Sequence, residues 1–235
     1  MKSKHYLTMG NFWMFWHMPK CGGSSFTKIL EKIFAVKKDY HPEDRTSLEY
    51  KEYLLNPIDL NKLNFKNCLI GHYNIEGIKL WQRYPDIERL KPIIFTILRD
   101  PLETAVSGVR FGIQNGWINK DLNQIELDKI FLGRSKYFSN VFGIKKSDEV
   151  HILKKLIWKS VDIKNANILL KHIQNELIKS EEFNQEKLCF ESFEIPIINV
   201  TSNKYKYYPS LKARDEFLKK STLDYDIYNS LTSNL

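Results

Sequence analysis

Lys20 stands between an apolar run and a helical pattern in the stretch "WHMPKCGGSSF", whose residue types suit an anion-binding loop. Gly22 and Gly23 have no Cβ atom, so backbone N–H groups there can approach an anion closely. The helix expected to begin near Ser24 directs its unpaired N–H groups to the same point. Lys20 adds a positive charge, and Ser24 and Ser25 add hydroxyl donors. The stretch predicts a phosphate site; a tight turn with a serine cap is the alternative, but it leaves the lysine unexplained.

Arg99 and Ser107 form a second candidate anion site, in the stretch "TILRDPLETAVSG". Arg99 ends an apolar run, and Ser107 lies within the helix expected to begin at Pro101, with Asp100 as its cap. At about 1.5 Å rise per residue, Ser107 lies near the end of the second turn, so both side chains can hold one anionic group. Each charge-assisted bond from the arginine contributes about 1.5–3 kcal/mol. An ion pair of Arg99 with Asp100 or Glu103 is the structural alternative.

His72 is the candidate general base, because it follows the apolar run "NCLIG" and an imidazole titrates near neutral pH. On its own, such a histidine is more often a satisfied core residue, and only the neighbouring phosphate site favours catalysis. His17 is interpreted as structural or supporting. Cys21, at a helix N-terminus, has a position where a thiol pKa can fall, but no second catalytic group is tied to it.

Four apolar runs predict the strands that position these residues: residues 12–16, 67–73, 92–98 and 196–200. Continuous apolar runs are typical of a parallel sheet covered on both faces, and helical patterns lie between them. The fold class is therefore α/β. Since ligands bind beyond the carboxyl ends of the strands in such a sheet, we expect the lysine, histidine and arginine to meet in one crevice.

The rest of the chain is predicted to be loops and helices. Residues 40–66 indicate a polar loop with a short helix, and the tail from about 210 indicates one or two amphipathic helices. Residues from about 122 to 182 are expected to form a mainly helical insertion or lid. We expect residues 1–235 to form one domain.

Composition narrows the class of partner. The 235 residues are 43% hydrophobic and 13% aromatic, which argues against disorder, and the net charge of +8 favours anionic partners. The three cysteines are widely spaced, which fits a reducing compartment and neither a disulfide framework nor a metal site. There is no signal-peptide pattern and no apolar run of roughly 20 residues, so we expect a soluble, cytoplasmic protein without a transmembrane segment.

These motifs carry a family resemblance. "HMPKCGGSSF" resembles the H-[IV]-P-K-[TS]-G-[GS]-[TS]-[ST] signature of carbohydrate-type sulfotransferases, and "TILRDPLETAVSG" resembles their second signature. "GHYNIEGI" is similar to the Gly-His segment of the uronyl 2-O branch, the heparan sulfate 2-O-sulfotransferase type. "INVTSNKYKYYPSL" and "DYDIYNSL" resemble the closing pattern. The matching pieces span nearly the whole chain in the right order.

The resemblance implies a P-loop-NTPase-like sheet and a sulfonate donor, 3′-phosphoadenosine 5′-phosphosulfate (PAPS). It implies that the 5′-phosphosulfate is held by Lys20, Gly22, Gly23, Ser24, Ser25 and Phe26. It implies that Arg99 and Ser107 hold the 3′-phosphate, and that Lys20 stabilises charge on the bridging oxygen as the S–O bond breaks. The acceptor would be a hydroxyl, by default on a carbohydrate, with His72 as its base; no metal is implied, and no nucleic-acid partner is expected.

The sequence departs from the family signatures at two points, and two other classes of function remain as alternatives. Cys21 replaces the usual Thr or Ser, and "GVRFG" after Ser107 lacks the usual aromatic pair, which puts the acceptor class in doubt. A nucleotide phosphotransferase would need magnesium and an acidic ligand, for which Asp100 is the only obvious candidate. A basic nucleic-acid-binding module would use "NKYKYYPSLKAR", which is read equally well as a loop over the ligand.

Overall fold

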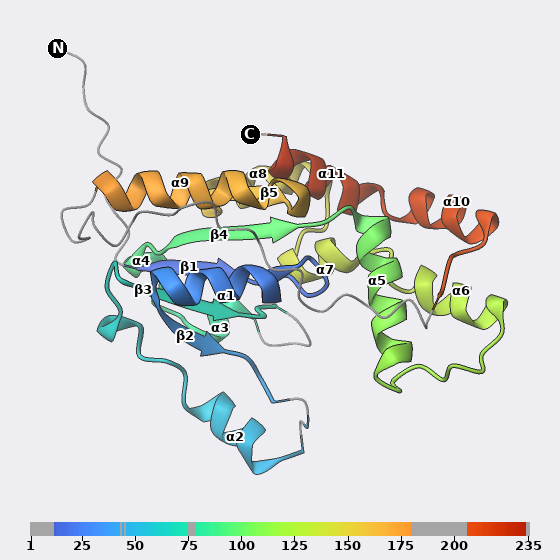
Figure 1. The fold of residues 1–235 in the computed structure, drawn as a ribbon, viewed down its shortest axis with the longest axis horizontal. Helices are drawn as coiled ribbons and strands as arrows, with labels where there is room; N and C mark the ends of the chain where they lie inside the picture. The colour runs from blue at the N-terminus through green and yellow to red at the C-terminus, as the bar shows by residue number, and fades with distance from the viewer. Residues whose placement is uncertain (1–11, 43, 45, 75–78, 180–205, 234–235) are drawn as a thin grey trace.

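Five parallel strands form one sheet in the order β2-β3-β1-β4-β5 (Figure 1). The computed structural model describes residues 12–42, 44, 46–74, 79–179 and 206–233. The strands are β1 (Trp13–Trp16), β2 (Ala35–Asp39), β3 (Asn67–Gly71), β4 (Ile93–Leu98) and β5 (Lys159–Asp162). Helices flank the sheet, so the expected α/β class, with a P-loop-like parallel sheet, is confirmed.

The three central strands are the ones that the sequence predicts. The apolar runs at 12–16, 67–73 and 92–98 correspond to β1, β3 and β4. The two outer strands were missed, because edge strands are short and carry polar residues: β2 reads "AVKKD" and β5 reads "KSVD". The described part of the range 122–182 is mainly helical, as expected, and the structure adds the four-residue strand β5 within it. The fourth expected strand, 196–200, lies outside the described residues.

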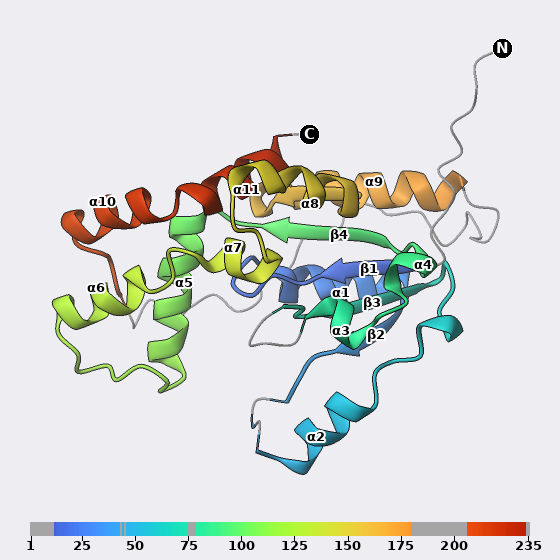
Figure 2. The same ribbon diagram turned by 180° about the vertical axis from the view of Figure 1, so that it is seen from behind.

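Alternate residues of β1 enter two separate apolar clusters. Trp13 and Phe15 belong to the cluster on one face, and Met14 and Trp16 to the cluster on the other. Both faces are therefore covered, as a buried parallel strand requires. The first face carries α1 (Gly23–Ile33) and α9 (Ala166–Lys179). The second, seen in Figure 2, carries α3 (Leu80–Arg83), α4 (Ile87–Leu90), α7 (Tyr137–Phe142), α8 (Val150–Leu156) and α11 (Thr222–Thr232).

A third apolar cluster lies beyond the carboxyl ends of the strands, where the arrow of β4 points in Figure 1. It is formed by α5 (Pro101–Gln114), α6 (Gln124–Leu132) and α10 (Leu211–Lys220). Helix α5 begins as expected, with Pro101 in its first turn and the Asp100 carboxylate accepting the Glu103 N–H at 3.0 Å. This group of helices places α5 beside the strand ends; a lid role stays a prediction.

The remaining helices follow the expected pattern. The polar region 40–66 contains α2 (Leu48–Leu55), and the tail forms α10 and α11. No helix in the described ranges is both long enough and apolar enough to span a bilayer.

Candidate active site

Three aromatic side chains form a row beyond the strand ends. The registers of β2, β3 and β1 align the last residues of the three strands. The next residue of each strand is Tyr40, His72 and His17 respectively. The ring of His72 lies 4.7 Å from that of Tyr40 and 4.6 Å from that of His17, measured between centroids. His72 is thus at the middle of the row.

His72 is neutral at physiological pH in the free protein. Burial, with smaller contributions from His41 and Lys20, lowers its pKa to about 4. Its Nε2 atom is buried and has no hydrogen-bond partner among the described residues. A neutral imidazole with an unused ring nitrogen has the protonation state of a base, and an anion bound near Lys20 would raise its pKa towards neutrality.

His17 supports this row from the core. It is 6% exposed, stacks on Phe15 with centroids 5.4 Å apart, and its Nδ1 lies 2.7 Å from the Tyr40 hydroxyl. Burial lowers its pKa to about 3, with smaller effects of His72 and Lys20. These contacts agree with the structural interpretation of His17.

The two glycines of the loop are required by packing within the protein. Gly22 has a φ of +79°, and a Cβ there would lie 2.0 Å from Cδ1 of Ile163, which follows β5. A Cβ on Gly23 would lie 2.0 Å from the His17 ring. The sequence explains the glycines by close approach of a phosphate; the structure adds that the loop cannot pack against His17 and Ile163 without them.

The first turn of α1 directs backbone N–H groups at the strand-end edge. The N–H groups of Ser25 and Phe26 donate to the carbonyl oxygen of Gly22 at 3.2 and 3.4 Å, so the N–H groups of Gly23 and Ser24, which precede them, are the ones placed to contact a ligand. Ser24 is exposed, whereas Ser25 is 7% exposed. The Phe26 ring is fully buried against Phe15, so it anchors the first turn of α1 in the core and does not face a ligand.

Lys20 points towards α5. Its ammonium lies 3.0 Å from the centroid of the Phe111 ring, and its backbone has a φ of +66°. Burial and the neighbouring Arg134 lower its pKa to about 8. Lys20 is therefore a cation held at a cost in free energy, as expected for a charge whose partner is a ligand.

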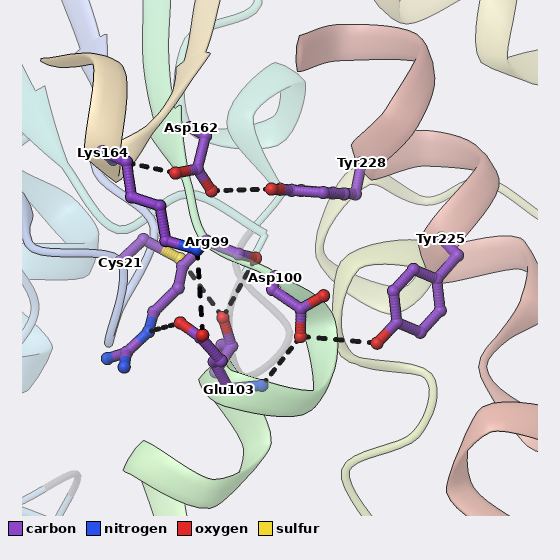
Figure 3. A network of polar contacts seen from close by, with 9 residues as sticks. Cys21, Arg99, Asp100, Glu103, Asp162, Lys164, Tyr225 and Tyr228 are labelled. Carbon is purple, nitrogen blue, oxygen red and sulfur yellow. Dashed lines mark hydrogen bonds and ion pairs between the residues drawn. The ribbon is translucent and has the colours of Figure 1, made fainter. Parts of the chain in front are cut away.

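Arg99 forms the ion pair with Glu103 that the sequence offered as a structural alternative. Its Nε donates to Glu103 at 3.0 Å, and the Lys164 ammonium lies 4.0 Å from the same carboxylate. Figure 3 shows the two terminal nitrogens of the guanidinium pointing away from Glu103. Glu103 thus orients Arg99 and leaves its terminal nitrogens available to an anion.

One face of α5 joins the two candidate anion sites. Glu103, Ser107 and Phe111 are spaced at i, i+4 and i+8, so they lie on the same side of the helix over about 12 Å. Arg99 contacts the first of these residues and Lys20 the last. The structure therefore brings Lys20, Ser107 and Arg99 along one line, and Lys20 is also close enough to His72 to lower its pKa.

Helix α11 fixes the loops after β4 and β5 (Figure 3). The Tyr225 hydroxyl donates to Asp100 at 3.3 Å, and the Tyr228 hydroxyl donates to Asp162 at 2.7 Å. Asp162 also accepts the Lys164 N–H at 2.8 Å. Both carboxylates therefore act as caps of the segments that follow them.

Cys21 is a buried structural thiol. It is fully buried, 3.8 Å from the Thr104 hydroxyl, and burial raises its pKa to about 12. A protonated, buried thiol is not a nucleophile, in agreement with the sequence interpretation.

Sequence reasoning missed three residues of this site: Tyr40, Phe111 and Arg134. Tyr40 follows the unpredicted strand β2, and Arg134 follows α6, far along the chain from both motifs. Of the three, only Phe111 could have been found from the sequence, since it lies four residues after Ser107 on the same helix face. A hollow of about 440 Å³ lies elsewhere, lined by Glu31, Phe34, Val36, Lys37, Lys38 and Ile58 beside edge strand β2.

The stretch "NKYKYYPSLKAR" is described from residue 206 onwards. There, Tyr207 is 2% exposed and its hydroxyl donates to Asp128 at 2.8 Å, whereas Tyr208 is exposed beside Arg110. Tyr207 is therefore part of the third apolar cluster and not of a nucleic-acid-binding face.

Comparisons with solved structures find similar folds, two sulfotransferases among them. No protein-family model and no curated protein matches the chain. A sulfotransferase from Alicyclobacillus acidocaldarius is 14% identical with a TM-score of 0.46, over 95% of this chain and 96% of that chain. Mouse sulfotransferase SULT7A1, complexed with PAP, is 15% identical with a TM-score of 0.43, over 96% of this chain and 68% of that chain. Similarity at this level does not assign a family or an activity to this chain.

Proposed function

We propose that the protein is a PAPS-dependent sulfotransferase that moves a sulfonate group to an acceptor hydroxyl, by default on a carbohydrate. The observation that carries the proposal is the alignment of Lys20, Ser107 and Arg99 along one face of α5, beside the N-terminus of α1. The two cations contact helix positions about 12 Å apart along α5, which suits a ligand with two separate anionic ends. PAPS has this form, with a phosphosulfate at one end and a 3′-phosphate at the other.

The loop after β1 would hold the phosphosulfate. The N–H groups of the first turn of α1, the hydroxyls of Ser24 and Ser25, and the Lys20 ammonium are its donors. Gly22 and Gly23 allow the backbone to approach, and the buried Phe26, whose N–H donates to Gly22, holds the loop in shape. Lys20 would stabilise the negative charge that develops on the bridging oxygen, the group that leaves with the nucleotide.

The helix α5 would hold the other end. The terminal guanidinium nitrogens of Arg99 and the Ser107 hydroxyl would donate to the 3′-phosphate. Glu103 keeps the guanidinium in place and Tyr225, through Asp100, keeps the first turn of the helix in place.

His72 would remove the proton from the acceptor hydroxyl as it attacks sulfur. Its neutral imidazole and its unpartnered Nε2 support this role. The low pKa of the free protein would rise when the anionic donor offsets the charge of Lys20, which brings the base closer to the pH at which it works. Catalysis would then consist of positioning and electrostatic stabilisation, by analogy with phosphoryl transfer.

Calorimetric titration tests the proposal. The purified protein is titrated with adenosine 3′,5′-bisphosphate (PAP) without metal, with adenosine 5′-phosphate, and with magnesium-ATP. Micromolar binding of PAP that is lost when the 3′-phosphate is absent would support the proposal. Binding of magnesium-ATP in its place would indicate phosphoryl transfer, and binding of neither nucleotide would refute a donor site at this edge.

A further inference from the structure

Arg134 and Lys20 lie next to one another against α5. The Lys20 ammonium is over the ring of Phe111, and the terminal Nη1 of Arg134 lies 2.7 Å from where a Cβ on Gly108 would be. Gly108 and Phe111 are three residues apart, so the two cations occupy neighbouring positions on the helix surface. Their proximity is also seen in the effect of Arg134 on Lys20, whose pKa it helps to lower.

Within the described ranges, no carboxylate forms an ion pair with either of these two charges. Neither Lys20 nor Arg134 takes part in an ion pair among the described residues. Arg134 Nε is buried without a hydrogen-bond partner in the same part of the chain, and so is the hydroxyl of the nearby Tyr137. Buried donors are almost always paired, so two cations without a carboxylate partner, one of them with an unpaired Nε beside an unpaired tyrosine hydroxyl, indicate an anion that is bound in the working protein.

We propose that Arg134, with Lys20, binds the sulfonate end of the donor. The inference rests on the proposed function and adds a residue that lies outside both sequence motifs. Ser107 lies one turn before Phe111, and Glu103, which Arg99 contacts, lies two turns before it, which leaves the Lys20 end of the helix for the reactive group.

The chemistry fits a second cation at this position. The bond between sulfur and the bridging oxygen breaks with its electron pair leaving on that oxygen, a new bond forms from sulfur to the acceptor oxygen, and the acceptor proton moves to His72. Negative charge then lies on the sulfonate oxygens and the bridging oxygen together. A guanidinium presents several donors in a fixed plane and is suited to the oxygens, while the Lys20 ammonium is a compact charge suited to the leaving oxygen.

The test compares PAPS with PAP, which lacks the sulfonate. Arg134→Gln should weaken PAPS binding by roughly 10- to 100-fold, as expected for lost charge-assisted bonds. Its PAP affinity should stay within about threefold of wild type, because PAP has no sulfonate for Arg134 to bind. Lys136→Gln is the matched control, because it removes an equal charge two residues away from an exposed side chain and should change neither affinity. Arg134→Lys should restore part of the lost PAPS affinity.

Gly108→Ala provides a test that keeps the charge. The new Cβ would displace the flexible end of Arg134, while alanine favours the helix more than glycine does. We expect weaker PAPS binding with a melting temperature that is unchanged or raised, a combination that a purely structural role of Arg134 would not produce.

The outcomes separate the inference from the proposed function. Equal losses of PAPS and PAP affinity in Arg134→Gln, equal effects of Arg134→Gln and Lys136→Gln, or unchanged PAPS affinity in Gly108→Ala would each overturn the inference. If the wild-type protein binds neither PAPS nor PAP, the proposed function itself fails. If it binds both and Arg134→Gln behaves like wild type, only the role of Arg134 is refuted.

Discussion

Replacing Gly23 with alanine distinguishes two reasons for a glycine in the loop after β1. If the glycine only allows a ligand to approach, alanine should leave the free protein as stable as wild type. The structure gives a different expectation, because the new Cβ would lie 2.0 Å from Cδ2 and 2.2 Å from Nε2 of the His17 ring. Contacts that short require the buried ring to move.

The expected cost follows from what His17 would lose. Overpacking in a filled core costs about 1–3 kcal/mol, and loss of the 2.7 Å contact with the Tyr40 hydroxyl adds about 0.5–1.5 kcal/mol. The free energy of unfolding should therefore fall by about 2–4 kcal/mol. For a chain of 235 residues this corresponds to a melting temperature lower by roughly 5–15 °C.

Thermal and urea unfolding, followed by circular dichroism, measure this change. Gly133→Ala is the control, since a Cβ there meets only ordinary contacts of 3.4 Å and more. We expect it to match wild type. A Gly23→Ala protein with the wild-type melting temperature but no PAP binding would refute the packing argument and would assign the glycine to the ligand alone.

Four further predictions concern charge and catalysis. Asp39→Ala should lower the free energy of unfolding by about 3–5 kcal/mol in urea titrations, because it leaves the buried Arg83 guanidinium without its carboxylate partner. Asp39 binds that guanidinium through both oxygens, at 2.6 and 2.8 Å. A loss below about 1 kcal/mol would contradict this expectation. His72→Ala should reduce sulfonate transfer by roughly 10²–10⁴-fold while PAP affinity persists, and near-wild-type turnover would exclude His72 as the base. PAP affinity, measured calorimetrically, should fall as the pH rises through about 8, since Lys20 in the free protein loses its proton there, and a flat profile from pH 7 to 9 would show that this charge is not used. Arg99→Ala should weaken PAP binding by roughly 10-fold or more, and an unchanged dissociation constant would remove Arg99 from the 3′-phosphate site.

The same lysine has a consequence for stability. Its folded pKa of about 8 lies below its ordinary value of 10.5, so the unfolded chain binds more protons between these two values. The contribution of Lys20 to stability is therefore unfavourable below pH 8 and improves as the pH rises from 8 towards 10.5. A bound anion reverses the shift, which is why ligand binding should take up protons near pH 8.

Much of the fold could be predicted because it depends on local patterns. The central strands are continuous apolar runs, and the start of α5 is indicated by the capping residue Asp100 and by Pro101. The edge strands β2 and β5 could not be recognised from the sequence. Both are short and carry polar residues, so neither forms a continuous apolar run. The fourth expected strand, at 196–200, remains outside the described residues.

The candidate site was also predicted in part from the sequence. The residues expected to bind an anion, Lys20, Arg99 and Ser107, lie along one helix face, and His72 lies close to Lys20. The ion pair of Arg99 with Glu103 was weighed from the sequence as a structural alternative, and it coexists with terminal nitrogens that point away from Glu103.

The sequence by itself determined the local chemistry: a lysine and two glycines before a helix, an arginine before a capped helix, and a histidine at a strand end. These features are set by neighbours within a few residues, through backbone conformation, capping and the period of apolar residues. The tertiary structure alone decided that Tyr40, His72 and His17 form a row, that the His17 ring requires Gly23, and that Arg134 stands beside Lys20. Apart from Gly23 and His17, which are 6 positions apart, these contacts join residues 23 to 114 positions apart, and they depend on strand order and register, which no local period specifies.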